Sequence, residues 1–323
     1  MSALPVPLQW LKALLRPLVR RIRELPDLPL VLAFVTSGQG RTHGVTPWRK
    51  WRLARRIIGN SYRVRSGSNW RQHLRLVDEI LRIPSQVPGD VVECGCYNGA
   101  SSASLSLACA LTGRRLLVCD SFEGLPEPEE AERYEIHSHD QGFYYVWEKG
   151  EFQSAGGLDG VRQVVGALGE LSVCTFVQGY FNATLATLPS ERLVLVFEDA
   201  DLASSVRDCL LTLWPRLQEG CRFFCHEPWS INVVGLFYDR SWWQQNLGHP
   251  PPGFQGSGQG VPLFSGLSWP WRWWGWEPSV MGYAEKFDFQ RVREQGGKII
   301  HHGSSGFQEG QGGRFVDGRW QDR

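Results

Sequence analysis

The stretch Val91–Pro126, VVECGCYNGASSASLSLACALTGRRLLVCDSFEGLP, decides the fold of this chain. An apolar run ends at Glu93, a glycine-containing turn leads to Gly99, and small residues then open a helical stretch. A second apolar run, residues 116–119, ends in Asp120. This order predicts strand, turn, helix and strand, with an acid at the carboxyl end of each strand. Such a unit suits a ligand with a ribose, because one carboxylate can accept hydrogen bonds from two hydroxyls.

The chain from Gly89 onward alternates short apolar runs with helical segments, the pattern of a parallel sheet covered on both faces. Strands are expected at Asp90–Glu93, Leu116–Asp120, Val173–Gln178, Leu193–Glu198 and Cys221–His226. A helix between the last two is expected to end near Pro215. Ligands of open parallel sheets bind outside the carboxyl ends of the strands, so the polar residues there are the candidates for a site. They are Glu93, Asp120, Gln178, Asp199, Asp201, His226 and Glu227.

Composition allows one large domain with appendages: the chain has 323 residues, of which 42% are hydrophobic. The formal net charge of +1 argues against general nucleic-acid binding. Eight cysteines lie mostly in apolar runs, with no C-x-x-C pair, which is typical of buried free thiols in a reducing cytosol. No apolar stretch reaches the roughly 18–20 residues that span a bilayer, and the start lacks the order of a signal peptide. We therefore expect a cytoplasmic protein.

Charge is uneven along the chain, because arginines are many and acids few between Leu11 and Arg71. Apolar residues recur at helical spacing from Leu8 to Ile22, with arginines on the other positions. A basic amphipathic helix of this kind can lie on an anionic membrane surface, or pack on its own domain or a second subunit. Residues 1–84 are therefore interpreted as a basic helical extension, with peripheral membrane contact as one open hypothesis.

The spacing of the glycines distinguishes between two candidate nucleotide cofactors. Gly95-x-x-x-Gly99 lacks the strict G-x-G-x-x-G of a pyrophosphate-binding turn. An acid after the second strand suits any ribose. The chemistry of the turn therefore favours S-adenosylmethionine (SAM) over NAD.

The pattern E-C-G-x-x-x-G-x-S, followed by D-S-F-E-G-L-P, resembles the macrocin-type sugar O-methyltransferase family, the TylF–MycF group. The likeness continues in W-x-K-G at residues 147–150 and VQGYFNATL at residues 177–185, and it covers about residues 85–228. It implies a class I SAM-dependent (Rossmann-like) fold with about seven strands, occupying residues 85–323. It also implies methyl transfer to a hydroxyl of a sugar moiety or related small molecule, with a divalent metal, usually Mg²⁺.

The resemblance implies roles for individual residues. Those matched to the SAM site are Glu93, Gly95, Gly99 and Ser101 around the methionine part, Asp120 and Ser121 at the ribose, and Gln178 and Gly179 near the adenine. Asp199 matches a metal ligand and candidate general base. Asp201, two positions on, is expected to cap the following helix.

The chain departs from the family after the next strand, where relatives place an Asp-Asp pair and this chain has His226-Glu227. Asp199, His226 and Glu227 offer two carboxylates and an imidazole, a set that suits Mn²⁺, Fe²⁺, Co²⁺ or Zn²⁺ better than Mg²⁺. Three hypotheses stay open: a metal site, metal-free catalysis with His226 as the base, and lost catalysis. In the last case the chain is a SAM-binding interaction protein with membrane-surface or partner contacts.

Tryptophans are dense in a predicted insertion around residues 229–278: Trp229, Trp242, Trp243, Trp269, Trp271, Trp273, Trp274 and Trp276. Aromatic faces suit sugar rings, so this segment is a candidate lid over the acceptor. Trp is also enriched at subunit interfaces, and a homo-oligomer is expected on that account.

Overall fold

The computed structural model describes residues 27–136, 144–257, 281–287, 314–316 and 319–321. The helix expected near residues 8–22 and the tryptophans at 269–276 lie outside these ranges. The helices are α2 (Leu28–Thr36), α3 (Pro47–Asn60), α4 (Trp70–Arg82), α5 (Ala100–Thr112), α6 (Gly157–Leu168), α7 (Phe181–Thr184), α8 (Ala203–Leu213), α9 (Ile231–Leu236) and α10 (Arg240–Leu247). No helix in the described ranges has the length and apolar character to cross a membrane.

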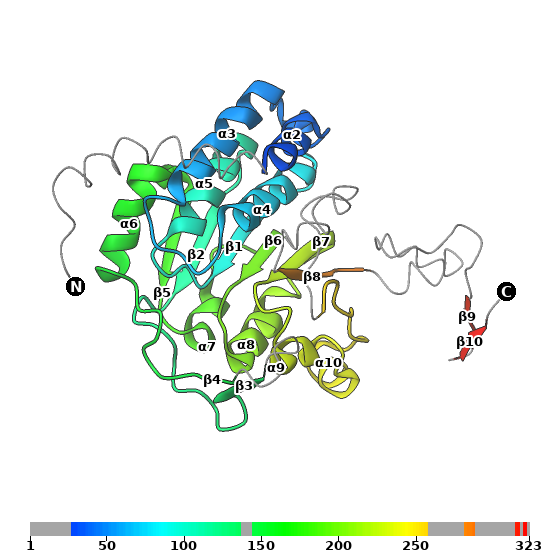
Figure 1. The fold of residues 1–323 in the computed structure, drawn as a ribbon. Coiled ribbons are helices and arrows are strands. Elements are labelled where there is room, and N and C mark those ends of the chain that lie inside the picture. Colours follow the sequence, from blue (N-terminus) through cyan, green and yellow to red (C-terminus); the bar gives the residue numbers. More distant parts are fainter. Residues whose placement is uncertain (1–26, 137–143, 258–280, 288–313, 317–318, 322–323) are drawn as a thin grey trace.

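A six-stranded sheet forms the centre of the molecule, in the order β5-β2-β1-β6-β7-β8 (Figure 1). Its strands are β1 (Asp90–Cys94), β2 (Leu116–Asp120), β5 (Cys174–Gln178), β6 (Leu193–Glu198), β7 (Leu217–Cys225) and β8 (Gly282–Glu285). The first five are parallel, and β8 pairs antiparallel with β7. About seven strands were expected, and six lie in this sheet among the described residues. Small hairpins form from β3 (Tyr134–Ile136) with β4 (Tyr144–Val146), and from β9 (Arg314–Val316) with β10 (Arg319–Gln321).

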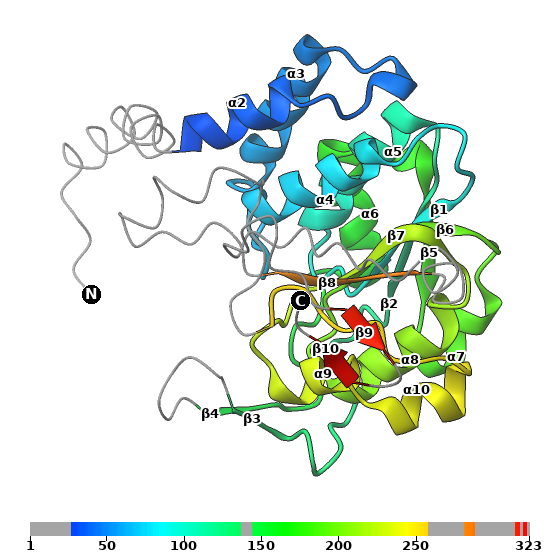
Figure 2. The same cartoon turned by 90° about the vertical axis from the view of Figure 1, so that its right-hand side faces the viewer.

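The sequence makes the central strands because continuous apolar runs suit a sheet that is buried on both faces. Every residue of β2 and β6 is buried. Helix α5 packs against both α4 and α6, and α8 packs against both α7 and α9 in a second group (Figure 2). Both α4 and α8 contact β6. The expected parallel α/β architecture with helices on both faces is therefore confirmed.

Helices α3 and α4 belong to the same hydrophobic core as the sheet. Asn69 and Gln72 start α4 with a capping box. Glu79 of α4 is fully buried and pairs with Arg75, Arg82 and, across to β7, Arg222. Burial raises the pKa of this carboxyl, but the three guanidiniums lower it below its usual value. This network ties α4 to the sheet.

The two ends of the sheet carry different segments (Figure 1). Helices α2 and α3 lie at the end where α5 and α6 finish, beside the amino ends of the strands. The β3–β4 hairpin and α7 to α10 lie at the carboxyl ends.

Candidate functional site

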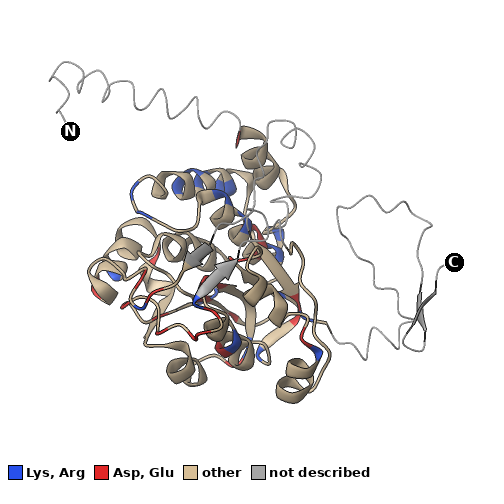
Figure 3. Ribbon diagram, turned by 60° about the horizontal axis from the view of Figure 1, so that its bottom comes forward, with Lys and Arg blue, Asp and Glu red and all other residues tan. Residues whose placement is uncertain are grey.

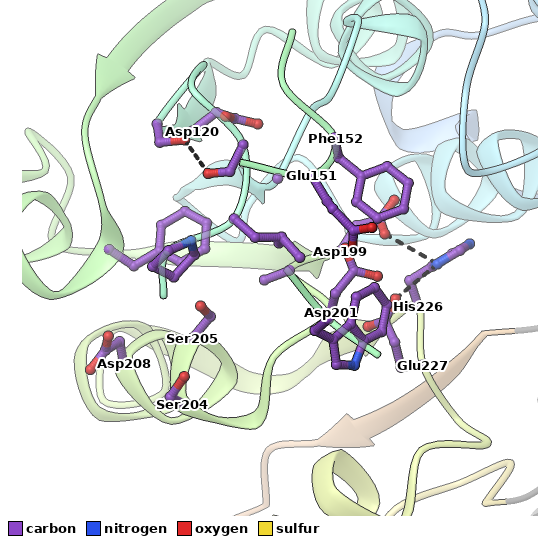
Figure 4. Close-up of a pocket in the computed structure, with 18 of the residues that line it drawn as sticks. Asp120, Glu151, Phe152, Asp199, Asp201, Ser204, Ser205, Asp208, His226 and Glu227 are labelled. Carbon is purple, nitrogen blue, oxygen red and sulfur yellow. Dashed lines mark hydrogen bonds and ion pairs between the residues drawn. The ribbon is translucent and has the colours of Figure 1, made fainter. Parts of the chain in front are cut away.

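A cavity of about 770 Å³ opens at the carboxyl ends of the strands (Figure 4). Eight of the candidate residues named from the sequence line it: Gly95, Ser101, Asp120, Ser121, Asp199, Asp201, His226 and Glu227. Four others, Glu93, Gly99, Gln178 and Gly179, are not among its described lining residues. The structure thus brings the two acids after β2 and β6 and the pair after β7 into one space.

Gly95 allows the ends of β1 and β6 to meet. Its φ is 85°, a left-handed conformation that favours glycine. A Cβ at this position would overlap the carbonyl oxygen of Asp199. Because the Asp199 N–H donates to the Cys94 carbonyl at 2.8 Å, Asp199 lies beside the turn that joins β1 to α5.

Asp120 organises the loop that was predicted to hold the ribose. Its Oδ2 accepts the Cys96 N–H at 2.7 Å, and its Oδ1 accepts the Phe122 N–H at 2.6 Å. Burial raises the pKa of this carboxyl, and the two backbone bonds oppose that rise. A carboxylate oxygen has more than one acceptor direction, so both oxygens retain capacity for ligand hydroxyls.

Glu93 lies behind the turn and is fully buried. Ser102 Oγ donates to its Oε2 at 2.5 Å, while Oε1 has no hydrogen-bond partner among the described residues. Burial raises the pKa of Glu93 to about 8, so the carboxyl is mainly protonated at neutral pH.

Gly179 and Gln178 sit where β5 ends beside β2. The Gly179 N–H donates to the Asp120 carbonyl at 2.9 Å, and a φ of 137° makes this position one for glycine. Gln178 is exposed, whereas the next residues, Tyr180 and Phe181, line the cavity. These two predicted residues therefore support the cavity wall from its edge.

The carboxylates of Asp199 and Glu227 both approach one atom, Nδ1 of His226 (Figure 4). His226 Nδ1 lies 3.1 Å from Asp199 Oδ1 and 2.9 Å from Glu227 Oε1. Burial lowers the pKa of this imidazole, but the two carboxylates raise it, so that the net pKa lies well above its usual value. One Nδ1–H cannot make two good hydrogen bonds at once, so a proton alone satisfies this cluster incompletely.

Further carboxyls surround this cluster. Burial raises the pKa of Glu198 to about 7, and burial with the nearby Asp199 raises that of Asp201 to about 8. Glu198 Oε2 is buried without a hydrogen-bond partner in the described part of the chain. Because isolated negative charge is costly to bury, this region suits a cationic ligand or a metal ion.

Among the residues that the structure describes, two triads of side chains have the geometry to hold a metal ion. Asp199, His226 and Glu227 line the cavity, whereas Glu198 and Cys225, which join Glu227 in the second triad, do not. Burial raises the pKa of the Cys225 thiol well above its usual value, which disfavours the thiolate that a metal needs. The first triad is therefore the better candidate.

Asp201 does not cap α8, contrary to the expectation from its position. The N-cap is Leu202, which makes no side-chain cap, and Asp201 adopts a φ of 62° on the cavity wall. Glu132, from the loop after β2, takes over this role: its carboxylate accepts the Ser204 N–H at 2.8 Å and the Ser204 hydroxyl at 2.5 Å. A cap supplied 72 positions away leaves no local sequence signal.

Aromatic side chains form another part of the wall. Trp229 meets the His226 ring at 5.7 Å between centroids, and Phe152 meets Tyr97 at 5.8 Å. Trp243, by contrast, is fully buried and packs on Trp214, so this member of the dense tryptophan segment belongs to the core.

Residues 66–68 also line the cavity, although sequence reasoning placed them in the N-terminal extension. Ser68 Oγ lies 2.9 Å from His73 Nε2, and His73 Nδ1 lies 3.2 Å from Ser104 Oγ of α5. Burial lowers the pKa of His73 to about 4, so this ring is neutral and joins three segments behind the site. The motif S-G-S signals a turn but carries no indication of its place in the fold.

The model of the macrocin-O-methyltransferase family, TylF, matches residues 65–226, which is half of the chain. The chain belongs to this family. The resemblance seen in the sequence motifs is confirmed, and the family match begins at the loop that lines the cavity.

Individual relatives match the same part of the chain. An 8-demethyl-8-(2,3-dimethoxy-alpha-L-rhamnosyl)-tetracenomycin-C 4'-O-methyltransferase of Streptomyces olivaceus is 35% identical over 144 residues, 42% of this chain and 51% of the relative. Mycinamicin III 3''-O-methyltransferase of Micromonospora griseorubida is 30% identical over 148 residues, 42% of this chain and 53% of the relative. The chain thus spans about half the length of the curated relatives it matches.

Solved structures with a related arrangement include the O-methyltransferase NovP, at 17% identity and a TM-score of 0.47 over 72% of this chain and 88% of NovP. CalS11, a calicheamicin methyltransferase, matches at 16% identity and a TM-score of 0.46 over 75% of this chain and 94% of CalS11.

Proposed function

We propose that this chain is a SAM-dependent O-methyltransferase that acts on a hydroxyl of a sugar moiety or a related hydroxylated small molecule. The convergence of Asp199, His226 and Glu227 in the same cavity as Asp120 carries the proposal. The names of the relatives in the family support the reaction class.

The residues proposed to bind SAM fit its chemistry. Bound SAM supplies a methyl group on a positively charged sulfur. Asp120 would accept the ribose hydroxyls, while the Gly95 turn and Ser101 would face the methionine part, and Ser121 lies beside them in the wall. The acidic surroundings complement the positive charge of the cofactor.

Asp199, His226 and Glu227 are proposed to hold a divalent metal. Ligand atoms about 2.1 Å from an octahedral metal and at right angles are about 3 Å apart, close to the 2.9 and 3.1 Å separations from His226 Nδ1. A divalent metal supplies positive charge that lowers the pKa of an acceptor hydroxyl. The imidazole suits Mn²⁺ or a later transition metal better than Mg²⁺.

Asp199 is the proposed proton acceptor. The acceptor oxygen forms a bond to the methyl carbon while the carbon–sulfur bond breaks, and the hydroxyl proton passes to Asp199. In the metal-free alternative His226 takes the proton instead; the two carboxylates beside its Nδ1 raise the pKa of this imidazole well above its usual value. Trp229 and Phe152 line the cavity and are proposed to flank a sugar ring.

The test is methyl transfer from SAM to a panel of glycosides and nucleotide-linked sugars, after chelation and with added Mn²⁺ or Mg²⁺. We expect turnover that requires metal and prefers Mn²⁺. The matched variant is His226→Asp, which replaces the imidazole with a carboxylate, gives an Asp-Glu pair close to the Asp-Asp pair of the family and should shift the preference toward Mg²⁺. Binding of SAM without turnover on any acceptor would instead favour the SAM-binding interaction protein.

The metal ligands can be tested without turnover. Mn²⁺ titration followed by electron paramagnetic resonance should show nitrogen coupling from His226 in the wild type, and the His226→Asp variant should lose it. Mn²⁺ binding without nitrogen coupling would remove His226 from the ligand set.

A further inference from the structure

One continuous stretch of this chain carries basic residues and no acidic ones. Residues 28–77 contain ten Lys or Arg and no Asp or Glu. Residues 78–323 contain 19 Lys or Arg against 31 Asp or Glu, so the near-zero net charge conceals two regions of opposite sign. In Figure 3, Lys and Arg positions are concentrated on the upper helices, whereas Asp and Glu positions lie mainly in the lower part of the ribbon.

Helix α3 displays this charge because its two faces differ. Thr46 caps the helix, and Leu53, Ala54 and Ile57 face the core. The opposite side carries Arg49, Arg52, Arg55 and Arg56, and Arg63 follows just after the end of the helix; all five are exposed, and together we call them the α3 basic face. The helix is thus amphipathic, with arginine in place of the usual mixture of charges.

Acids do not neutralise this face. None of the ion pairs formed within the described residues includes an arginine of the α3 basic face. Arg56 donates to the carbonyls of Leu168 and Gly169 at the end of α6, which fixes one arginine and leaves the others toward solvent. One acid, Glu170, borders a shallow hollow beside Arg49 and Arg52.

Apolar side chains stand beside the arginines. Trp48 is 65% exposed and shares a helix stripe with Arg52 and Arg55, four and seven positions on. On α2, which packs against α3, Leu28 and Leu32 are 42% and 47% exposed and four positions apart. Arginine together with exposed Trp and Leu suits the boundary between lipid headgroups and acyl chains.

We infer that the α3 basic face docks on an anionic membrane surface. A single exposed helix face with apolar neighbours fits a plane of lipid headgroups better than it fits a nucleic-acid groove. The face lies at the amino ends of the strands, and the acidic cavity lies at their carboxyl ends, so a docked molecule turns its negative region and its cavity away from the lipid.

The experiment is sedimentation of the full chain with vesicles of phosphatidylcholine alone or with about 30% phosphatidylglycerol. We expect binding only to the anionic vesicles, weakened by salt. A variant with Arg49→Gln, Arg52→Gln and Arg55→Gln should bind about a hundredfold more weakly, at about a factor of five per arginine. The matched control replaces the exposed Lys149, Arg162 and Arg240 with Gln, which removes the same charge elsewhere and should leave binding within about threefold.

Three results would overturn the inference: equal binding of the wild type and the α3 variant, an equal loss in the control variant, or no binding of the wild type to anionic vesicles. Tighter binding to a DNA or RNA oligonucleotide than to the vesicles, lost in the α3 variant, would reassign the face to nucleic acid. Circular dichroism and thermal unfolding of all three proteins show whether each is folded. None of these readouts depends on methyl transfer.

Discussion

The two ends of the sheet carry charged residues of opposite sign and different burial. At the carboxyl ends, acids are buried around a cavity, and burial raises the pKa of Glu93, Glu198 and Asp201. At the amino ends, the arginines of the α3 basic face stay in water. Buried charge costs free energy until a specific partner compensates it, whereas exposed charge acts collectively and is screened by salt. The buried acids at the carboxyl ends therefore suit a few specific contacts with a ligand, whereas the exposed arginines at the amino ends suit contact with a broad anionic surface.

The largest effect is expected from Asp199→Asn. Loss of a proton acceptor and metal ligand should lower kcat about a thousandfold. Calorimetry should show SAM affinity changed by less than about threefold, because Asp120 remains. Asp159→Asn, on the exposed side of α6, is the control and should retain full activity. An active Asp199→Asn enzyme would remove Asp199 from the chemistry.

Glu93→Gln should change how stability depends on pH. The pKa of Glu93 is about 8 in the folded chain against 4.5 for an ordinary Glu. Below pH 4.5 both states hold the proton; above it the unfolded chain loses the proton first, so wild-type stability falls as pH rises to about 8. The variant lacks this loss, and its advantage should grow by up to roughly 3 kcal/mol between pH 5 and pH 8.

Urea unfolding of both proteins without SAM, at several pH values, measures this difference. Parallel curves for the wild type and the variant would show that Glu93 is ionised in the folded protein over this range.

Asp120→Ala should weaken SAM binding about a hundredfold, since two hydrogen bonds to a charged group are lost. The same change removes acceptors for the Cys96 and Phe122 N–H groups, so Tm should fall as well. Asp120→Asn keeps one acceptor oxygen and separates the two effects. SAM affinity unchanged in a folded Asp120→Ala protein would contradict the ribose role.

The smallest effect tests whether the two ends are independent. The variant with Gln at 49, 52 and 55 should methylate a water-soluble acceptor within about twofold of the wild-type rate, because no arginine of the α3 basic face lines the cavity. A large loss with a soluble acceptor would mean that the ends are coupled through the fold.

Five parallel strands were predicted to within a few residues, because buried strands read as unbroken apolar runs, as in β6. Strand β8 was not predicted: its four residues, GYAE, carry no such run, and pairing with β7 defines it. The β3–β4 hairpin in the loop after β2 was not predicted either. Pro215 marked the end of α8 correctly, since the helix stops at Leu213.

The candidate site was predictable where topology alone places a residue. Asp120, Asp199 and His226 follow parallel strands, so they had to meet at one edge. Glu132 and residues 66–68 reach the site through long-range packing, which no local pattern encodes. The shared Nδ1 contact of His226 also needed coordinates, because adjacent residues on a strand normally face opposite sides.

The bond between Glu132 and Ser204 has a consequence for how an acceptor enters. The loop around Glu132 forms part of the cavity wall through Glu127 and Glu129, and its carboxylate caps α8. Moving this loop outward uncaps the helix, at about 1 kcal/mol for a typical N-cap. The capping bonds to α8 therefore favour the loop position in which Glu127 and Glu129 form part of the cavity wall.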